Sequence, residues 1–242
     1  MNGPENGGGL LLRDAAAFYD RVAPFYDREY AFGPDVTRRQ AAWLAAHCPP
    51  GPLLDLGCGS GRMLAPLARA GFAPVLGLDC SPAMLALARA ACPAAPLIRA
   101  DAAHGLPFAA ASFSAIVSLH SSLIHICDPA AMAGLVADCR RALRPGGWLV
   151  IEAPHPRSYP PDVPPGRWRR FAPGILCRRV GSGLEELCIE DLGGLRTRVR
   201  LWEIEDLRRW FVGWSRVELH AGFCGGRFDP ERGTLMVVAA SL

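Results

Sequence analysis

Residues 53–68 of the chain read LLDLGCGSGRMLAPLA. An apolar run ends in an acid, three glycines alternate with other residues, and a helix-like pattern follows, which predicts a strand, a tight turn and a helix. Gly57, Gly59 and Gly61 remove side chains where a loop needs unusual backbone angles and where a ligand approaches the main chain. The spacing is GxGxG, whereas a dinucleotide fingerprint is GxGxxG, so the loop argues against NAD. By itself, such a loop can also be an ordinary strand-to-helix turn.

A second acid narrows the class of ligand. Residues 74–79, PVLGLD, are another apolar run that ends in an acid, and Ser81 and Pro82 are typical of a helix start. Asp79 lies 22 residues after Gly57. This is close to the roughly 20 residues that separate a glycine loop from an acid that binds ribose hydroxyls. We therefore expect a ligand that carries a ribose.

Further strands follow in a regular order. A short strand is predicted to end at Asp101, FSAIVSLH (113–120) predicts a fourth strand, and RPGGWLVIE (144–152) a turn into a fifth, with a helix over 130–143 between them. Together with DLGCGSG and LGLDCS, these segments resemble the class I S-adenosylmethionine-dependent methyltransferases of the small-molecule type. The resemblance implies an α/β fold, a Rossmann-like three-layer sandwich with a seven-stranded, mostly parallel sheet, whose last strand is antiparallel, and a small lid insertion.

The resemblance extends in both directions. FYDRVAPFYDREY (18–30) is similar to the paired YD helix that folds over the cofactor in this family, although an amphipathic surface helix explains the pattern too. VELHAGF (217–223) and TLMVVAA (234–240) resemble the closing hairpin. We expect a flexible leader at 1–12 and a single methyltransferase domain at 13–242, with 153–203 as an acceptor lid.

The resemblance also implies a cofactor site for S-adenosyl-L-methionine. Asp55 orders the glycine loop or accepts from the ammonium of the amino-acid tail, Asp79 binds the ribose diol, and Asp101 accepts from the adenine amino group. The expected cofactor-binding residues are Tyr19, Tyr26, Asp55, Gly57, Cys58, Gly59, Gly61, Asp79, Cys80, Met84, Asp101, Ala102, Leu119 and His120.

Methyl transfer to a small-molecule acceptor is an in-line displacement. It needs positioning of the acceptor and exclusion of water, and it needs a base only when the acceptor arrives protonated. Histidine titrates near neutrality, so His120, His125 and His155 are the candidate bases, and we select His120 and His155 as catalytic candidates. A packed or capping role for His120 is nearly as well supported, and many relatives use no base.

Composition limits the other possibilities. A net charge of +3 does not indicate nucleic acid, and all 26 basic residues are arginines, which excludes a lysine base or P-loop lysine. The nine cysteines show no CxxC pair, so we expect no metal and a reducing, cytoplasmic location. No apolar run reaches the roughly 18 residues of a membrane span. The expected partner is a small-molecule methyl acceptor, and the chain is a monomer or a homodimer.

The segment 153–203 is where the identity of the acceptor is expected to be encoded. Alternating runs around Gly193 and Gly194 predict antiparallel strands. Nearby arginines at 157, 167, 169, 170, 178 and 179 can bind an acidic substrate, although acids close by favour a solvated face. The alternatives that remain are a catalytically silent S-adenosylmethionine-binding protein, regulatory or interacting, and a nucleotide-dependent oxidoreductase.

Overall fold

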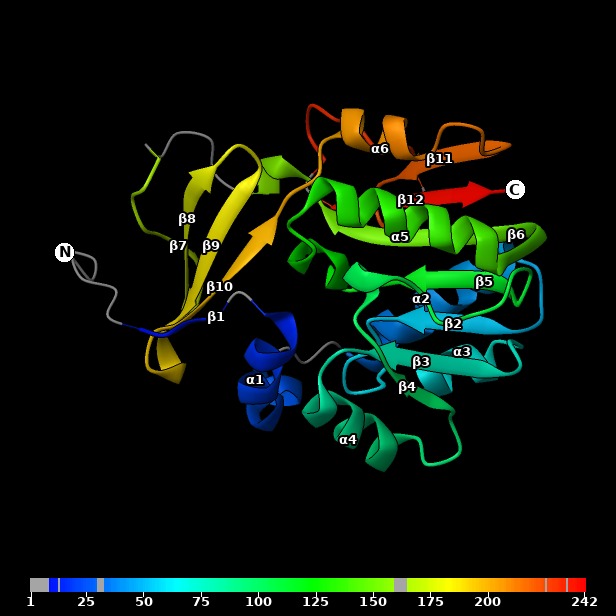
Figure 1. Ribbon diagram of the computed structural model, residues 1–242, viewed down its shortest axis with the longest axis horizontal. Coiled ribbons are helices and arrows are strands. Elements are labelled where there is room, and N and C mark those ends of the chain that lie inside the picture. Colours follow the sequence, from blue (N-terminus) through cyan, green and yellow to red (C-terminus); the bar gives the residue numbers. More distant parts are fainter. Residues whose placement is uncertain (1–8, 13, 30–32, 159–164, 225, 234) are drawn as a thin grey trace.

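A seven-stranded sheet and a separate five-stranded sheet organise the chain (Figure 1). The computed structural model describes residues 9–12, 14–29, 33–158, 165–224, 226–233 and 235–242. The larger sheet has the strand order β11-β12-β6-β5-β2-β3-β4. Its strands are β2 (Leu53–Leu56), β3 (Val75–Asp79), β4 (Leu97–Arg99), β5 (Phe113–Ser118), β6 (Leu143–Pro154), β11 (Arg216–His220) and β12 (Leu235–Ser241). Strands β2 to β6 are parallel and β12 is antiparallel to both of its neighbours, which confirms the predicted fold class.

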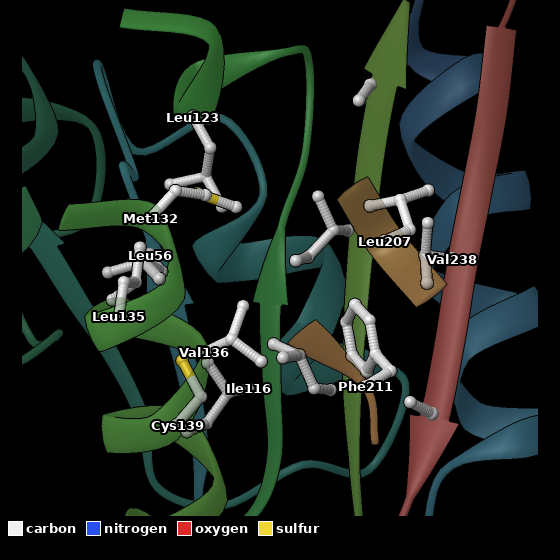
Figure 2. Packing of buried hydrophobic residues seen from close by; sticks show 14 of the residues in the cluster. Leu56, Ile116, Leu123, Met132, Leu135, Val136, Cys139, Leu207, Phe211 and Val238 are labelled. Carbon is white, nitrogen blue, oxygen red and sulfur yellow. The ribbon is translucent and has the colours of Figure 1, made fainter. Parts of the chain in front are cut away.

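Helices cover both faces of this sheet because its strands are apolar on both sides. On β2, Leu53 packs with helices α2 (Pro34–His47) and α3 (Leu64–Arg69), whereas Leu54 packs with α5 (Pro129–Ala142) and α6 (Ile204–Trp210). Figure 2 shows the second layer, in which Val136 of α5 lies beside Ile116 of β5, and Leu207 of α6 lies beside Val238 of β12. The result is the predicted three-layer arrangement.

The starts of two helices follow from their sequences. Ser81 is the N-cap of α4 (Pro82–Ala91) and its hydroxyl accepts from Met84 N at 3.1 Å. Asp128 caps α5 in the same way and accepts from Ala130 N at 3.0 Å. In both cases a proline follows at the first helical position. The N–H of this position makes no hydrogen bond within a helix, so proline, which lacks it, is well tolerated there. These caps fix α4 and α5 against the edge of the sheet where the parallel strands end.

The five-stranded sheet, here called the lid sheet, has the order β1-β10-β9-β8-β7. Its strands are β1 (Leu11–Leu12), β7 (Arg169–Ala172), β8 (Ile175–Gly181), β9 (Leu184–Ile189) and β10 (Leu195–Arg200). Strands β9 and β10 are antiparallel, with Gly193 and Gly194 at φ +66° and +74° in the turn between them, as the sequence predicts. Positions 159–164 of the lid segment lie outside the described residues.

The N-terminal segment differs from the expected flexible leader. Residues 1–8 lie outside the described part, but Leu11 and Leu12 form β1, which pairs in parallel with β10. Arg196 N donates to Leu10 O at 2.9 Å, and the Arg196 guanidinium donates to Gly9 O. The structured part therefore begins within the segment assigned to the leader, because partly buried leucines complete the edge of the lid sheet.

The lid arginines are neutralised by neighbouring acids. Glu185 and Glu186 are 1% and 2% exposed, and each is paired with arginines of the lid sheet. Arg178 and Arg196 both lie within 3.1 Å of Glu186. Such internal pairing explains the arginine-rich stretch as part of the folded lid sheet.

Candidate functional site

The glycine loop after β2 is shaped by left-handed backbone at Gly57, Gly59 and Gly61, with φ of +75°, +54° and +80°. A Cβ at Gly57 would lie 2.6 Å from Ser122 Cβ, so no side chain fits there. At Gly61 it would lie 2.9 Å from Ala88 Cβ of α4. Gly57 therefore allows the loop to approach the turn that carries Ser122, and Gly61 allows it to approach α4.

Two neighbouring hollows lie at this loop. The larger one has a volume of about 310 Å³, and the smaller one of about 20 Å³ shares Tyr26, Gly57 and Gly59 with it. Among the predicted residues, the larger cavity is lined by Tyr19, Tyr26, Gly57, Gly59, Asp79, Cys80, Met84, Asp101 and Ala102. The smaller pocket is lined by Tyr26, Asp55, Gly57, Cys58, Gly59, Leu119 and His120. Gly61 and His155 line neither hollow.

Asp79 lines the larger cavity and is already hydrogen-bonded to the main chain. Its carboxylate accepts from Gly59 N at 2.8 Å and from Ser81 N at 2.9 Å. Burial raises the pKa of Asp79, whereas these backbone donors lower it. Each carboxylate oxygen has a second lone pair, so the group can still accept from a vicinal diol.

Asp101 lies at the exposed rim of the same cavity. It is the N-cap of η1 (Ala102–His104), accepts from Ala103 N at 2.9 Å, and has His104 Nδ1 at 2.9 Å from its other oxygen. Asp101 follows β4 in a short loop. Its carboxylate and the neighbouring main-chain groups can hydrogen-bond the edge of a planar base such as adenine. Met84 and Cys80 line the same cavity and are its apolar candidates for contact with the base.

Asp55, in the smaller pocket, is 3% exposed. Burial, and secondly the nearby Asp79 carboxylate, raise the pKa of Asp55 to about 7. Two buried carboxylates close together favour a cationic ligand, because a positive charge would offset both the desolvation and the repulsion. A tail that carries an ammonium group fits this pair of hydrogen-bond acceptors.

The paired YD pattern has a structural explanation in α1 (Ala15–Glu29). Tyr19 and Tyr26 both line the cavity, seven residues apart and therefore on one face of the helix. Asp20 accepts from Ser81 Oγ at 2.6 Å and Ala83 N at 3.2 Å, at the start of α4. Asp27 accepts from Ser60 Oγ at 2.7 Å, in the glycine loop. Each tyrosine thus lines the cavity, and each aspartate attaches the helix to the wall of the site. Tyr30 lies outside the described residues.

Arg62 and Ser122 were not predicted from the sequence. Arg62 lines the smaller pocket, pairs with Asp27 at 3.2 Å, and lies 5.5 Å from the centre of the Tyr26 ring. The signal for Arg62 was its place directly after the third glycine. Ser122 donates to Gly57 O at 3.0 Å, but nothing in its local pattern indicates this contact.

His120 and His125 occupy different hollows. His120 lines the smaller pocket, and burial, with a contribution from Arg62, lowers its pKa to about 4. His125 lines the larger cavity beside Tyr19, with the hydroxyl oxygen and Nε2 2.9 Å apart, and burial lowers its pKa to about 4 as well. Both imidazoles are therefore neutral at physiological pH. The predicted strand 113–120 ends earlier, at Ser118, because His120 and Ser121 adopt left-handed backbone.

His155 lies at the end of β6 in a separate cleft of about 850 Å³, between the lid sheet and α6. It is 5% exposed and its ring packs 5.2 Å from that of Phe228. Burial and Arg157 lower the pKa of His155. The cleft also contains Arg179 and Glu203, so it is polar and carries both charges.

Comparisons with known proteins agree with this geometry. Residues 53–147 match the family described as a methyltransferase domain. A demethylmenaquinone methyltransferase of Tropheryma whipplei is 36% identical over 147 residues, which are 58% of this chain and 59% of that protein. A probable S-adenosylmethionine-dependent methyltransferase of Mycolicibacterium smegmatis is 34% identical over 195 residues, which are 78% of this chain and 66% of that protein. The chain spans about 43% to 59% of the length of the first curated relatives it matches.

Solved structures show the same fold. The CcbJ methyltransferase of Streptomyces caelestis has a TM-score of 0.77 at 22% identity, covering 94% of this chain and 98% of that one. CalS10, an amino pentose methyltransferase from Micromonospora echinaspora solved with S-adenosylmethionine bound, has a TM-score of 0.64 at 25% identity, covering 91% and 97%. The chain belongs to the class I S-adenosylmethionine-dependent methyltransferases.

Proposed function

We propose that the protein is an S-adenosylmethionine-dependent methyltransferase that transfers a methyl group to a small-molecule acceptor by in-line displacement. The observation that carries the proposal is the pair of joined hollows at the glycine loop. One suits an adenosine, with Asp79 and Asp101 as acceptors, and the other suits a charged amino-acid tail, with Asp55 and Arg62. Family membership supports the same cofactor.

Each part of the cofactor has a suitable partner among the residues. Asp79 would accept from the ribose hydroxyls, Asp101 from the adenine amino group, and Ala102 N would donate to a ring nitrogen. Asp55 would accept from the ammonium, and Arg62 would pair with the carboxylate. Cys58 and Leu119 close the smaller pocket, and Gly57 and Gly59 let the main chain approach the ligand.

When bound, S-adenosylmethionine supplies an activated methyl group on a sulfonium. The chain contributes position and environment, because Tyr19 and Tyr26 of α1 line the site. Their rings can stabilise a cationic ligand, and exclusion of water strengthens every positioning contact. A neutral His125 hydrogen-bonded to Tyr19 can accept a proton from an acceptor that arrives protonated. His120 and His155 remain proposed site residues, in the tail pocket and in the lid cleft.

A catalytically silent S-adenosylmethionine-binding protein is the alternative. The covered cavity and the named methyltransferases among the relatives favour transfer over this alternative. Among those relatives, one is named for demethylmenaquinone, another for trans-aconitate, and CalS10 for an amino pentose. We propose a small organic acceptor that enters beside the lid formed within 153–203.

Calorimetry tests the cofactor, and a labelled-donor screen tests the transfer. S-adenosylmethionine and S-adenosylhomocysteine should bind, whereas NAD should not; tight NAD binding without either sulfur ligand would refute the proposal. Incubation of metabolite mixtures with methyl-labelled S-adenosylmethionine should then identify a labelled product. Cofactor binding without transfer to any acceptor would favour the silent alternative.

The helices and the cysteines bear on the cellular location of the protein. Among the described residues, none of the helices has the length and apolar character that a membrane crossing requires. All nine cysteines are free thiols, several of them buried, which supports a reducing, cytoplasmic location. We propose that the protein acts there as a monomer or homodimer without nucleic acid.

A further inference from the structure

The larger cavity meets the lid sheet at its Cys127 side. Cys127 and Asp128 line the cavity, and Arg200 Nε of β10 donates to Cys127 O at 2.6 Å. Arg198 lies two residues earlier in β10, so both arginine side chains leave the strand on the same face. Asp128, the neighbouring acid, is exposed and already accepts a hydrogen bond from the start of α5. Two guanidinium groups therefore lie on the side of β10 that meets the cavity.

The two ends of the larger cavity differ in charge. At the end assigned to adenosine, burial, and secondly the carboxylates of Asp79 and Asp101, raise the pKa of the Cys80 thiol to about 12. At the other end burial also raises the pKa of the Cys127 thiol, but the two β10 arginines lower it. An anion is therefore favoured beside Cys127 and disfavoured beside Cys80, because like charges repel and opposite charges attract.

Arg198 is the least neutralised of the three arginines that surround Glu186. Arg178 Nη2 and Arg196 Nη1 lie 3.0 and 3.1 Å from Glu186 Oε1. Arg198 Nε lies 3.9 Å from Oε2, too far for a hydrogen bond, and this buried atom has no hydrogen-bond partner among the described residues. The Arg198 side chain is nevertheless 31% exposed, so a ligand can reach it. One carboxylate thus serves three guanidinium groups, and the surplus positive charge lies on Arg198.

We propose that the methyl acceptor carries an anionic oxygen group, a carboxylate or a phosphate, which Arg198 binds where the lid sheet meets the Cys127 side of the larger cavity. This inference rests on the proposed function and names the class of its acceptor. Arg200 has a structural part, because its bonds to Cys127 O and Ser182 O hold β10 against the cavity wall. Arg198 is the residue that determines specificity, since a planar guanidinium matches the oxygens of a carboxylate or phosphate and distinguishes them from a neutral analogue.

The first experiment sorts acceptors by charge and needs no variant. A deproteinised cell extract is separated on an anion exchanger, and the retained and unretained fractions are incubated with the wild-type protein and methyl-labelled S-adenosylmethionine. Labelled product should form from the retained fraction; its formation mainly from the unretained fraction would overturn the inference. Alkaline phosphatase treatment of the retained fraction then distinguishes the two anions, because transfer that survives the treatment identifies a carboxylate acceptor and transfer that is lost identifies a phosphate.

The second experiment tests Arg198 itself with the acceptor of the retained fraction. Arg198→Gln should lower kcat/KM about 10- to 100-fold, mainly through KM, which is the range of one hydrogen bond to a charged group. Arg198→Lys keeps the charge and should lose less. Arg170→Gln is the matched control, because Arg170 pairs with Glu190 at 2.7 Å on β7, at the opposite edge of the lid sheet, and should leave kcat/KM unchanged. An unchanged kcat/KM in Arg198→Gln, or an equal loss in Arg170→Gln, would overturn the inference.

Binding of S-adenosylhomocysteine separates the role of Arg198 from general damage. Arg198 is not among the residues that line the two hollows, so the calorimetric Kd of this ligand should be the same in the wild type and in both arginine variants. A parallel loss of this affinity in Arg198→Gln would overturn the role of Arg198 in acceptor specificity. A wild-type protein that binds S-adenosylhomocysteine but labels neither fraction refutes the proposed transfer itself. One that labels only the unretained fraction refutes only the anionic class of the acceptor.

Discussion

Replacement of Asp55 by asparagine is expected to stabilise the ligand-free protein and to weaken its ligand binding. The pKa of Asp55 is raised from 3.8 to about 7 by burial and by Asp79. At about 1.4 kcal/mol per pKa unit, ionised Asp55 destabilises the folded state by up to about 4 kcal/mol. The folded protein binds more protons than the unfolded chain between these two values, so the free energy of unfolding should fall as pH rises from about 4 to about 7.

The Asp55→Asn variant lacks this titration. Its free energy of unfolding should therefore exceed that of the wild type by about 1–3 kcal/mol at a pH well above 7, and match it only below about pH 4, where Asp55 is protonated in both the folded and the unfolded protein. Its affinity for S-adenosylhomocysteine should fall by about 1.5–3 kcal/mol, because the ammonium loses a charged acceptor. Urea unfolding at both pH values and calorimetry measure the two effects.

The control is Asp229→Asn, because Asp229 is an exposed acid that accepts from Glu231 N outside the site. It should produce no stabilisation at high pH. Two results would refute this reasoning: destabilisation by Asp55→Asn at high pH, or a difference in stability that does not change with pH. Either would show that ionised Asp55 does not destabilise the ligand-free protein.

Three further changes probe the site. Asp79→Ala should weaken S-adenosylhomocysteine binding by about 1.5–3 kcal/mol in a folded protein, and unchanged affinity by calorimetry would contradict the ribose role. Gly57→Ala should abolish measurable binding because its Cβ would lie 2.6 Å from Ser122 Cβ, and the second change Ser122→Gly should restore part of it; a single variant that binds normally would show that the turn moves freely. Asp27→Ala removes the bond to Ser60 and should speed dissociation of S-adenosylhomocysteine in stopped flow, whereas an unchanged rate would mean that α1 is held by other contacts.

The sequence predicts what is encoded locally. The glycine loop, the acids that end β2 and β3, and the apolar runs of the sheet each carry their signal within a few residues. The caps of α4 and α5 are similarly visible as Ser81-Pro82 and Asp128-Pro129. These features could be read from the sequence because backbone geometry and burial restrict the residue types directly.

Other parts of the site depend on distant contacts. His120 N donates to Glu152, and His120 Nε2 lies 3.0 Å from Gln40 Oε1. Gln40 lies in α2 and Glu152 in β6, so no local sequence pattern predicts these contacts. The positions of His125 and His155 are also set by the tertiary fold, because they follow different strands and enter different hollows. Strand β1 was missed because two residues form no periodic pattern, and its pairing depends on β10, far along the chain.

The pairing of β1 with β10 connects the lid sheet to the helix that borders the cofactor cavity, and would couple the proposed acceptor to the cofactor. β1 ends at Leu12 and α1 begins at Ala15, so the lid sheet continues into the helix that Asp20 and Asp27 attach to the walls of the cofactor cavity. An acceptor that shifted the lid sheet would therefore also shift α1. Such a shift would change the contacts of Asp20 and Asp27 and hence the affinity for the cofactor. By reciprocity, the factor by which an acceptor alters cofactor affinity equals the factor by which the cofactor alters acceptor affinity.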